Sequence, residues 1–125
     1  MLIEGLLLFF KLLISHALCD FALQSPFIAR AKNRHNKPED NSVPPGQKVT
    51  PIWPYVLSAH ALIQAGGVYV VTNSPIAALI QLVSHWFLDF AKCENWTTPH
   101  MDQFAHASIL VFTSVALVAA EAGVL

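Results

Sequence analysis

Four long apolar stretches dominate this sequence of 125 residues, and they lie approximately at residues 2–24, 54–72, 76–92 and 101–121. A helix needs roughly 17 to 25 residues to cross a hydrocarbon layer about 30 Å thick. Each stretch is close to that length. The sequence therefore predicts an all-α protein, specifically a four-helix transmembrane bundle.

The composition supports a membrane protein over a conventional soluble one. Hydrophobic residues make up 54% of the chain and charged residues only 12%, against roughly a quarter charged in ordinary soluble domains. A formal net charge of -1 offers no basic surface for nucleic acid, so we expect membrane lipids and no nucleic acid as partners. Two cysteines, Cys19 and Cys93, do not make a disulfide framework. A soluble, fully buried helical bundle is the alternative, because the third stretch is short and Lys11 interrupts the first.

The connections between the stretches differ in kind. All eight prolines lie at or outside the stretch limits, where a missing backbone donor does least harm. Ser74-Pro75 and Thr98-Pro99 each place a capping side chain before a proline suited to the first helical position. These two connections should be short and join antiparallel neighbours. The first and second helices should instead be joined by a long, polar, mobile loop at 25–53, all within one domain spanning residues 1–125.

Basic residues predict the orientation in the membrane. The 25–53 loop carries the basic residues Arg30, Lys32, Arg34, Lys37 and Lys48, together with the acidic residues Glu39 and Asp40. The third connection begins after Lys92, whereas the turn at 73–75 has no basic residue. Because cytoplasmic loops are enriched in lysine and arginine, both chain ends should face away from the cytoplasm. Residues 1–5 carry Glu4 and no basic residue, which favours a permanent span over a signal peptide.

Ionisable residues inside the predicted spans follow a pattern. They are His16 and Asp20 on the first helix, His60 on the second, His85 and Asp89 on the third, and Asp102 and His106 on the fourth. In each of the three pairs the spacing is four residues, which places both side chains on one helix face. The first and third helices run toward the cytoplasm and carry the histidine before the aspartate, whereas the fourth helix runs away from it and carries the aspartate first. Every aspartate is therefore expected nearer the cytoplasm than its histidine.

Depth along the helices places these residues in two layers. At about 1.5 Å per residue, the four histidines come out at roughly 8 to 12 Å from the cytoplasmic helix ends. The three aspartates lie about one turn shallower. Ionisable groups at membrane depth are costly and are functional candidates by default.

Several functions suit such a cluster. Imidazole nitrogens and carboxylate oxygens in a helical bundle are usual ligands of Zn²⁺, Mn²⁺ or Fe²⁺, and seven of them could hold one or two ions. A network of His–Asp hydrogen bonds could instead pin the helices together, and a third possibility is a relay for protons or cations. Lys92, three residues after Asp89, could pair with it, hold an anionic substrate, or extend to the membrane interface.

The same residues resemble the pattern of a known family. The segments are His16-Ala17-Leu18-Cys19-Asp20-Phe21-Ala22-Leu23-Gln24, then His60, then His85-Trp86-Phe87-Leu88-Asp89-Phe90-Ala91-Lys92, and finally Asp102-Gln103-Phe104-Ala105-His106. Together they resemble the HxxxDFxLQ, H, HxxxDxxK and DQxxH motifs of the DUF3307 family of small bacterial and phage membrane proteins. The resemblance covers all four predicted helices and implies a multi-pass protein of the bacterial inner (cytoplasmic) membrane.

The DUF3307 pattern is similar to that of predicted membrane-bound metal-dependent hydrolases, which in turn look like relatives of helical zinc-dependent phospholipases and nucleases. This similarity implies a phosphoesterase-like metal site that acts on a small phosphorylated or lipid substrate at the cytoplasmic face. Asp20, Asp89 and Asp102 would be catalytic carboxylates as well as ligands, one of them a general base, and Lys92 would contact the anion. The competing class is a non-enzymatic membrane protein whose His/Asp cluster relays protons or metal ions, or only stabilises the bundle.

Overall fold

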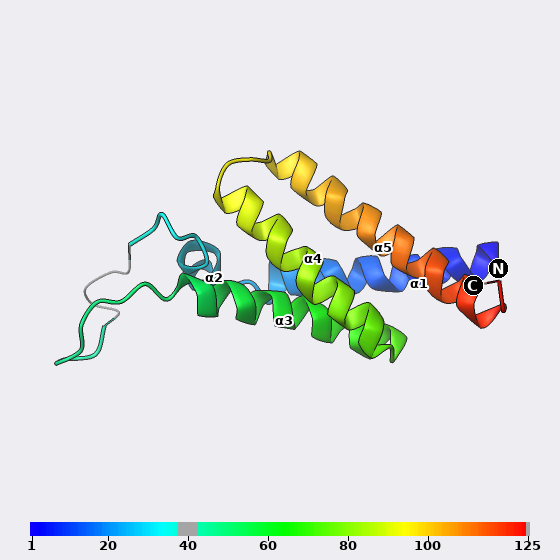
Figure 1. Cartoon of the computed structure of the whole chain (residues 1–125), viewed down its shortest axis with the longest axis horizontal. Coiled ribbons are helices and arrows are strands. Elements are labelled where there is room, and N and C mark those ends of the chain that lie inside the picture. The colour runs from blue at the N-terminus through cyan, green and yellow to red at the C-terminus, as the bar shows by residue number, and fades with distance from the viewer. Residues whose placement is uncertain (38–42, 125) are drawn as a thin grey trace.

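The structure, a computed structural model, describes residues 1–37 and 43–124, and within these ranges it contains helices and no β-strand. The elements in chain order are α1 (Leu2–Ala17), the π-helical turn η1 (Leu18–Ala22), α2 (Pro26–Ala31), α3 (Trp53–Thr72), α4 (Pro75–Cys93) and α5 (Pro99–Glu121). Figure 1 shows four long helices in one bundle, with the short α2 at one end. The prediction of an all-α four-helix bundle is confirmed.

Four helical segments are long and apolar enough to cross a membrane. They are Leu2–Ala22, which joins α1 and η1, followed by Trp53–Thr72, Pro75–Cys93 and Pro99–Glu121. Their outward faces are apolar: Phe10 and Leu79 are each 59% exposed, and Phe112 is 66% exposed. The histidines and aspartates predicted as ligands are all buried. An apolar exterior around a polar interior is the reverse of a soluble bundle, and it indicates a multi-pass membrane protein.

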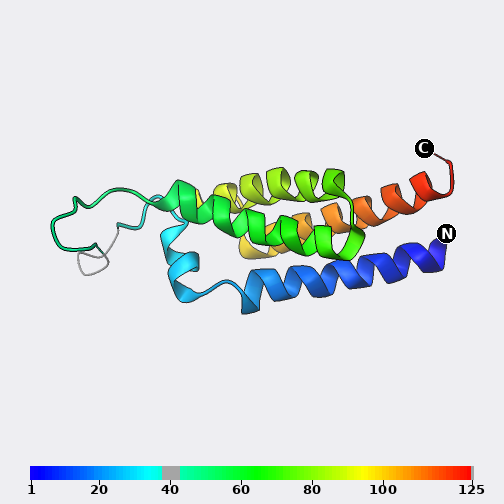
Figure 2. The ribbon, with the colours of Figure 1, turned by 90° about the horizontal axis from the view of Figure 1, so that it is seen from below.

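The long helices form a closed, antiparallel ring. α1 packs against α3 and α5, and α4 packs against the same two helices. Figures 1 and 2 show both chain termini at one end of the bundle and α2 at the opposite end. We call the end that carries α2 the loop end; it is formed by residues 23–37, 43–52 and 94–98. The ring encloses a central axis onto which every long helix presents one face.

The two short connections have the caps that the sequence predicts. Ser74 Oγ accepts a hydrogen bond from the backbone N–H of Ala77 at 3.2 Å. Thr98 Oγ1 accepts one from the backbone N–H of Met101, also at 3.2 Å. Each cap satisfies a donor that has no partner inside its own helix, and a proline follows each cap as the first helical residue. These caps begin α4 and α5 within a few residues of the preceding helix, so consecutive helices turn back on one another.

The segment between the first two spans differs from the predicted long polar loop. Residues 26–31 form α2, and the Ser25 side chain caps it by accepting a hydrogen bond from Ile28 N at 3.2 Å. Ser25-Pro26 is the same pairing of a cap with a proline that begins α4 and α5, so the sequence did carry a signal for this helix. The first span also ends at Ala22 and not at residue 24. Residues 38–42 of the predicted loop lie outside the described ranges.

A layer of apolar side chains closes the interior on the side of the chain termini. Its members are Leu12, Val68, Ala77 and Leu110, one from each long helix, and all are buried. Each lies four or eight residues from a buried histidine of its own helix, in the direction away from the loop end; these histidines are His16, His60, His85 and His106. At about 1.5 Å per residue, this is a separation of about 6 or 12 Å. The polar cluster therefore has an apolar floor beneath it, and its nearest route to water is the loop end.

Gly67 allows α1 and α3 to approach closely. A Cβ atom at this position would lie 2.3 Å from Ser15 Oγ and 2.9 Å from Cys19 Sγ, both of which belong to the first span. The same atom at Gly66 would have nothing within 4 Å. Only the second glycine of this pair is therefore required by the packing of the two helices.

We expect Gly67→Ala to lower the melting temperature in detergent, because the added methyl group overpacks the contact between α1 and α3, at a cost of about 1–3 kcal/mol. Gly66→Ala is the matched control, since it adds the same atom to the same helix in open space, and alanine favours a helix over glycine by about 1 kcal/mol. Combining Ser15→Ala with Gly67→Ala should restore part of the loss. Equal melting temperatures for the two single glycine variants would contradict the close approach.

Candidate metal centre

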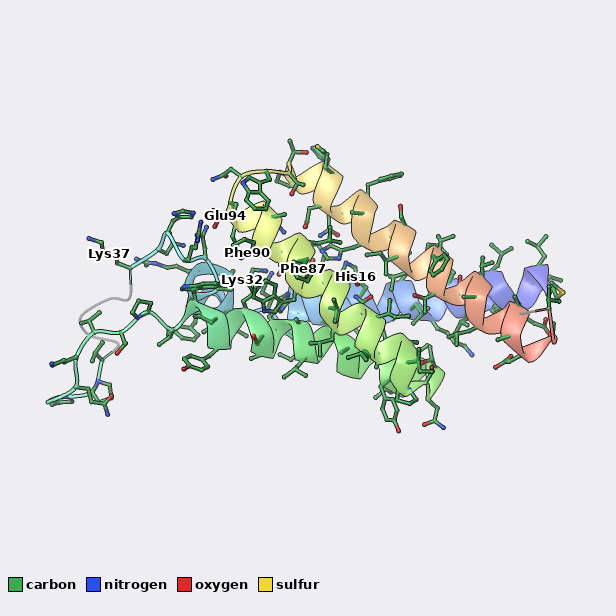
Figure 3. The ribbon with its side chains drawn as sticks, viewed as in Figure 1. His16, Lys32, Lys37, Phe87, Phe90 and Glu94 are labelled. Atoms are coloured by element: carbon green, nitrogen blue, oxygen red, sulfur yellow. The ribbon has the colours of Figure 1, made fainter. Side chains whose placement is uncertain are left out.

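The ionisable side chains predicted as ligands come from all four spans. They are His16 on α1, Asp20 on η1, His60 on α3, His85 and Asp89 on α4, and Asp102 and His106 on α5. Their relative exposure does not exceed 6%. Figure 3 shows His16 within the bundle. The structure brings all seven together around the central axis, which makes them one cluster, called here the His/Asp cluster.

The four imidazole rings form the layer that helix geometry predicts. The ring centroid of His85 lies 4.3 Å from that of His106, 5.0 Å from that of His60 and 5.9 Å from that of His16. The rings of His16 and His106 are 5.1 Å apart. His85 therefore contacts the other three rings and lies at the centre of the cluster.

The two central histidines both face two carboxylates. His60 Nε2 lies 3.2 Å from Asp20 Oδ1 and 3.4 Å from Asp89 Oδ2. His85 Nε2 lies 3.6 Å from Asp89 Oδ2 and 3.9 Å from Asp20 Oδ1. The imidazole nitrogens of α3 and α4 thus point at carboxylates supplied by η1 and α4. This arrangement mixes nitrogen and oxygen donors from three helices in one small volume.

Gln64 orients two members of the cluster, and the sequence analysis did not identify it. Its side-chain carbonyl accepts a hydrogen bond from His16 Nδ1 at 3.2 Å, and its amide nitrogen donates to Asp20 Oδ1 at 3.3 Å. Because Nδ1 of His16 carries the proton, Nε2 keeps a lone pair directed into the cluster. Gln64 lies one helical turn after His60 on the same face of α3, and that spacing was the available signal.

Many buried atoms of the His/Asp cluster have no hydrogen-bond partner among the described residues. They are Nε2 of His16, Nδ1 of His60, both ring nitrogens of His85 and of His106, Oδ1 of Asp89 and Oδ1 of Asp102. An unsatisfied buried polar group costs about 1–3 kcal/mol, so native proteins pair nearly all of them. A self-sufficient network of His–Asp hydrogen bonds would not leave so many. The donor set therefore fits a site that holds an ion.

Two triads within the cluster have the spacing of a metal site. Asp20, His60 and His85 each offer one donor atom, and these atoms lie within 4.8 Å of one another; the same holds for His85, Asp89 and His106. Two donors at about 2.0–2.1 Å from a tetrahedral zinc ion are about 3.3 Å apart. Small inward movements would bring either triad onto an ion, and His85 belongs to both triads.

Lys32 contacts the His/Asp cluster, although the sequence predicts it only as a residue of the polar loop. Its side chain is 5% exposed, and its ammonium donates a hydrogen bond to Asp89 Oδ2. It directly follows α2, so this short helix carries the ammonium over the open end of the bundle. Figure 3 shows Lys32 at the loop end, near the start of α3. No local pattern distinguishes this lysine from its exposed neighbours, because its burial depends on a residue 57 positions away.

Lys92 pairs with Asp102 and not with Asp89, the partner considered from the sequence. Its ammonium lies 2.9 Å from Asp102 Oδ2, and its side chain remains 32% exposed. With the imidazoles neutral, the three carboxylates and the two ammonium groups of Lys32 and Lys92 leave one uncompensated negative charge. Among the described residues no ammonium contacts Asp20, and Gln103 donates to its Oδ2 at 3.0 Å. A divalent cation beside Asp20 would reverse the sign of the local charge.

A clamp outside the spans fixes the residues that follow α2. Arg34 Nε lies 2.6 Å from Glu94 Oε1, and Arg34 Nη2 donates to Glu94 Oε2 at 2.7 Å. These hydrogen bonds hold the pKa of Glu94 below its ordinary value. The guanidinium also lies over the Phe90 ring, 5.4 Å from its centroid. The clamp ties the segment carrying Lys32 to the end of α4, next to the turn that bears Asp89.

One protein-family model matches almost the whole chain, including every residue of the His/Asp cluster. A family model described as "Protein of unknown function (DUF3307)" matches residues 8–124. The chain belongs to the DUF3307 family. The resemblance carried by the four helical motifs is thereby confirmed. No curated protein and no solved structure matches this DUF3307 chain.

We expect the purified protein to bind one or two transition-metal ions per chain. His85→Ala should weaken binding at least tenfold, because His85 belongs to both triads, whereas His100→Ala, which alters an exposed histidine of α5, should not change it. Elemental analysis measures the metal content, and a comparison of melting temperatures in the presence of Zn²⁺ or Mn²⁺ and in the presence of a chelator measures the stabilisation by metal. A ligand at 100 times its Kd adds about 2.7 kcal/mol to the free energy of unfolding.

Two results would contradict a metal centre. One is a protein that contains no metal after purification without chelator and binds none when it is added. The other is a His85→Ala variant whose melting temperature falls equally with metal and with chelator, because that pattern belongs to a hydrogen-bonded scaffold.

Proposed function

We propose that this DUF3307 protein is an integral membrane metal-dependent hydrolase acting on a phosphoester-like bond. One observation carries the proposal: two buried triads share His85, and their donor atoms include ring nitrogens and a carboxylate oxygen without hydrogen-bond partners. A buried scaffold favours saturated hydrogen bonds, whereas a metal centre requires free lone pairs. The cluster also lies nearer the loop end than the apolar layer does, within reach of a substrate from water or from the membrane boundary.

The proposed ligands are six residues of the cluster, and the seventh, Asp102, is left for proton transfer. The first triad, Asp20, His60 and His85, and the second triad, His85, Asp89 and His106, would hold one or two ions of Zn²⁺, Mn²⁺ or Fe²⁺, with His16 as a further donor. When bound, such an ion supplies Lewis acidity and lowers the pKa of a water molecule. Gln64 keeps the donor nitrogen of His16 unprotonated through its hydrogen bond to the other ring nitrogen.

Charge favours an anionic substrate. With neutral imidazoles, the cluster and its two ammonium partners carry one net negative charge, and a single divalent ion makes them net positive. Lys92 is the partly exposed cation of the site, so its ammonium is the group that would contact the phosphoryl oxygens as substrate enters. Lys32 is fully covered and would act on Asp89, holding one carboxylate oxygen and leaving Oδ1 for other contacts.

Asp102 is the best-placed general base. Its Oδ1 accepts no hydrogen bond from the described residues and lies 3.4 Å from His106 Nε2, while its Oδ2 is held by Lys92. In the proposed step, the oxygen of water forms a bond to phosphorus, the bond from phosphorus to the leaving oxygen breaks, and Oδ1 takes the proton of the water. Asp20 and Asp89 would serve mainly as ligands.

We expect metal-dependent release of nitrophenol from p-nitrophenyl phosphate or bis(p-nitrophenyl) phosphate by the purified protein in detergent. Asp102→Asn should lower kcat by about 10²–10⁴-fold, the usual contribution of general acid–base catalysis. Lys92→Ala should raise KM while leaving the metal content unchanged, because it lies outside both triads. His100→Ala is the control and should retain full activity.

The outcomes separate the proposal from its competitor. A protein that binds metal but releases nitrophenol from neither compound, with any of the three ions, is not the proposed phosphoesterase. If Asp20→Asn or Asp89→Asn instead abolishes proton flux in reconstituted vesicles, the cluster is a relay. Asp102→Asn with unchanged kcat would remove the proposed base.

We also propose the bacterial cytoplasmic membrane as the location, with both termini away from the cytoplasm. The support is the concentration of basic residues at the loop end, which favours the cytoplasmic side. A membrane-impermeant maleimide tests it, because the two native cysteines are buried. Lys48→Cys should be labelled only from the cytoplasmic side and Glu121→Cys only from the other. The reverse pattern would invert the orientation.

A further inference from the structure

A cavity of about 370 Å³ lies at the loop end, between α2 and the start of α3. Its wall includes Phe27, Arg30, Arg34, Lys37, Ile52 and Trp53, and no lining residue belongs to the His/Asp cluster. Aromatic and aliphatic side chains form one part of the wall and three basic side chains the other. A cavity of this composition suits a ligand with an anionic group attached to an apolar body.

The position of α2 places this cavity at the membrane boundary. Figure 1 shows α2 nearly end-on while the bundle lies horizontal, and Figure 2, turned by 90°, shows α2 running across the bundle axis. Helix α2 therefore lies crosswise beyond the end of the first span, as an interfacial helix does. Leu23 and Phe27 are 56% and 55% exposed at this level, and amphipathic aromatic residues such as Trp53 favour the same depth.

The wall of the cavity carries three basic side chains. Arg34 is bound to Glu94, which does not line the cavity, and the other two basic residues of the wall are Arg30 and Lys37. The 25–53 segment as a whole has five basic and two acidic residues. Guanidinium groups bind phosphate oxygens in bidentate fashion, and basic residues near an anionic leaflet attract its lipids.

We infer that this cavity binds the headgroup of an anionic phospholipid from the leaflet at the loop end. The phosphate lies against Arg30 and Lys37, and the upper part of an acyl chain lies against Phe27, Ile52 and Trp53. A free phosphate would leave the aromatic wall unused, and a zwitterionic lipid would bring a cation to a wall that carries three basic side chains. The inference does not depend on the proposed hydrolase, because the cavity shares no residue with the His/Asp cluster.

Binding of phosphatidylglycerol and phosphatidylcholine to the full chain in detergent, followed by native mass spectrometry, tests the inference. We expect saturable binding of one phosphatidylglycerol and at least tenfold weaker binding of phosphatidylcholine. The double variant Arg30→Gln/Lys37→Gln should bind phosphatidylglycerol about tenfold more weakly. Lys48→Gln is the matched control, since it removes an exposed charge from the same segment outside the cavity, and it should bind like the unaltered chain.

Three results would overturn the inference. Equal binding of the two lipids would remove the anionic preference, and equal weakening by Lys48→Gln would reveal diffuse surface attraction in place of a site. Displacement of the lipid by an equimolar amount of inorganic phosphate would identify a site for the free ion. Helix content by circular dichroism and metal content should match the unaltered chain in every variant, which shows that lost lipid binding is not lost folding.

A second measurement locates the lipid. In a variant that keeps Trp53 as its single tryptophan, through Trp86→Phe and Trp96→Phe, phosphatidylglycerol with bromine near the top of the acyl chain should quench the fluorescence. Adding Arg30→Gln/Lys37→Gln should reduce that quenching to the level seen with brominated phosphatidylcholine. Trp53 fluorescence that does not respond to either lipid would place any bound lipid elsewhere and overturn the inference.

Discussion

Three carboxylates lie inside a bundle whose outer surface is apolar, and an ionised carboxylate persists there only when donors or cations surround it. The structure meets this requirement separately for each one. Lys32 contacts Asp89, Lys92 contacts Asp102, and neutral donors, including Gln103, surround Asp20. The partners come from every long helix and from the residue after α2. The closed ring of helices and the placement of α2 together bring these partners to the three carboxylates.

The distribution of charge within the cluster is uneven, and this has a chemical consequence. Within the part of the chain that the structure describes, the carboxylate of Asp20 from η1 contacts no ammonium, while Asp89 and Asp102 contact one each. An added cation is therefore favoured on the side where Asp20, His60 and His85 converge. The apolar layer beneath the rings, which includes Leu12 and Leu110, excludes water on one side. The His/Asp cluster thus has an apolar layer on one side and ammonium groups on the other, and several of its atoms have no hydrogen-bond partner among the described residues. These properties fit a site that binds an ion better than a purely structural network.

The short helix α2 connects the interior to the membrane boundary. Its C-terminal neighbour Lys32 reaches Asp89, while Arg30 lines the outer cavity, so the two sides of one small element face two different environments. The clamp between Arg34 and Glu94 fixes the chain just beyond α2 to the end of α4. A ligand held in the outer cavity would thus contact the same helix that covers the His/Asp cluster.

Local physical rules were sufficient for much of this protein. The length of the apolar stretches determined the four spans, and the spacing of four residues determined that each histidine shares a face with its aspartate. Helix rise then placed the histidines in one layer, as the ring contacts of His85 show. The pairing of Ser25 with a proline was also readable, but only a comparison with the caps of α4 and α5 would have revealed α2 within the polar segment.

Tertiary structure alone decided which charges meet. The contact of Lys32 with Asp89, the choice of Asp102 as the partner of Lys92, and the bridging role of Gln64 each join residues from different parts of the ring. Sequence spacing reports distances along one helix, whereas these contacts depend on how the helices are rotated and ordered around the axis. The order and rotation of the helices follow from the packing of side chains over the whole bundle. No short stretch of sequence determines them.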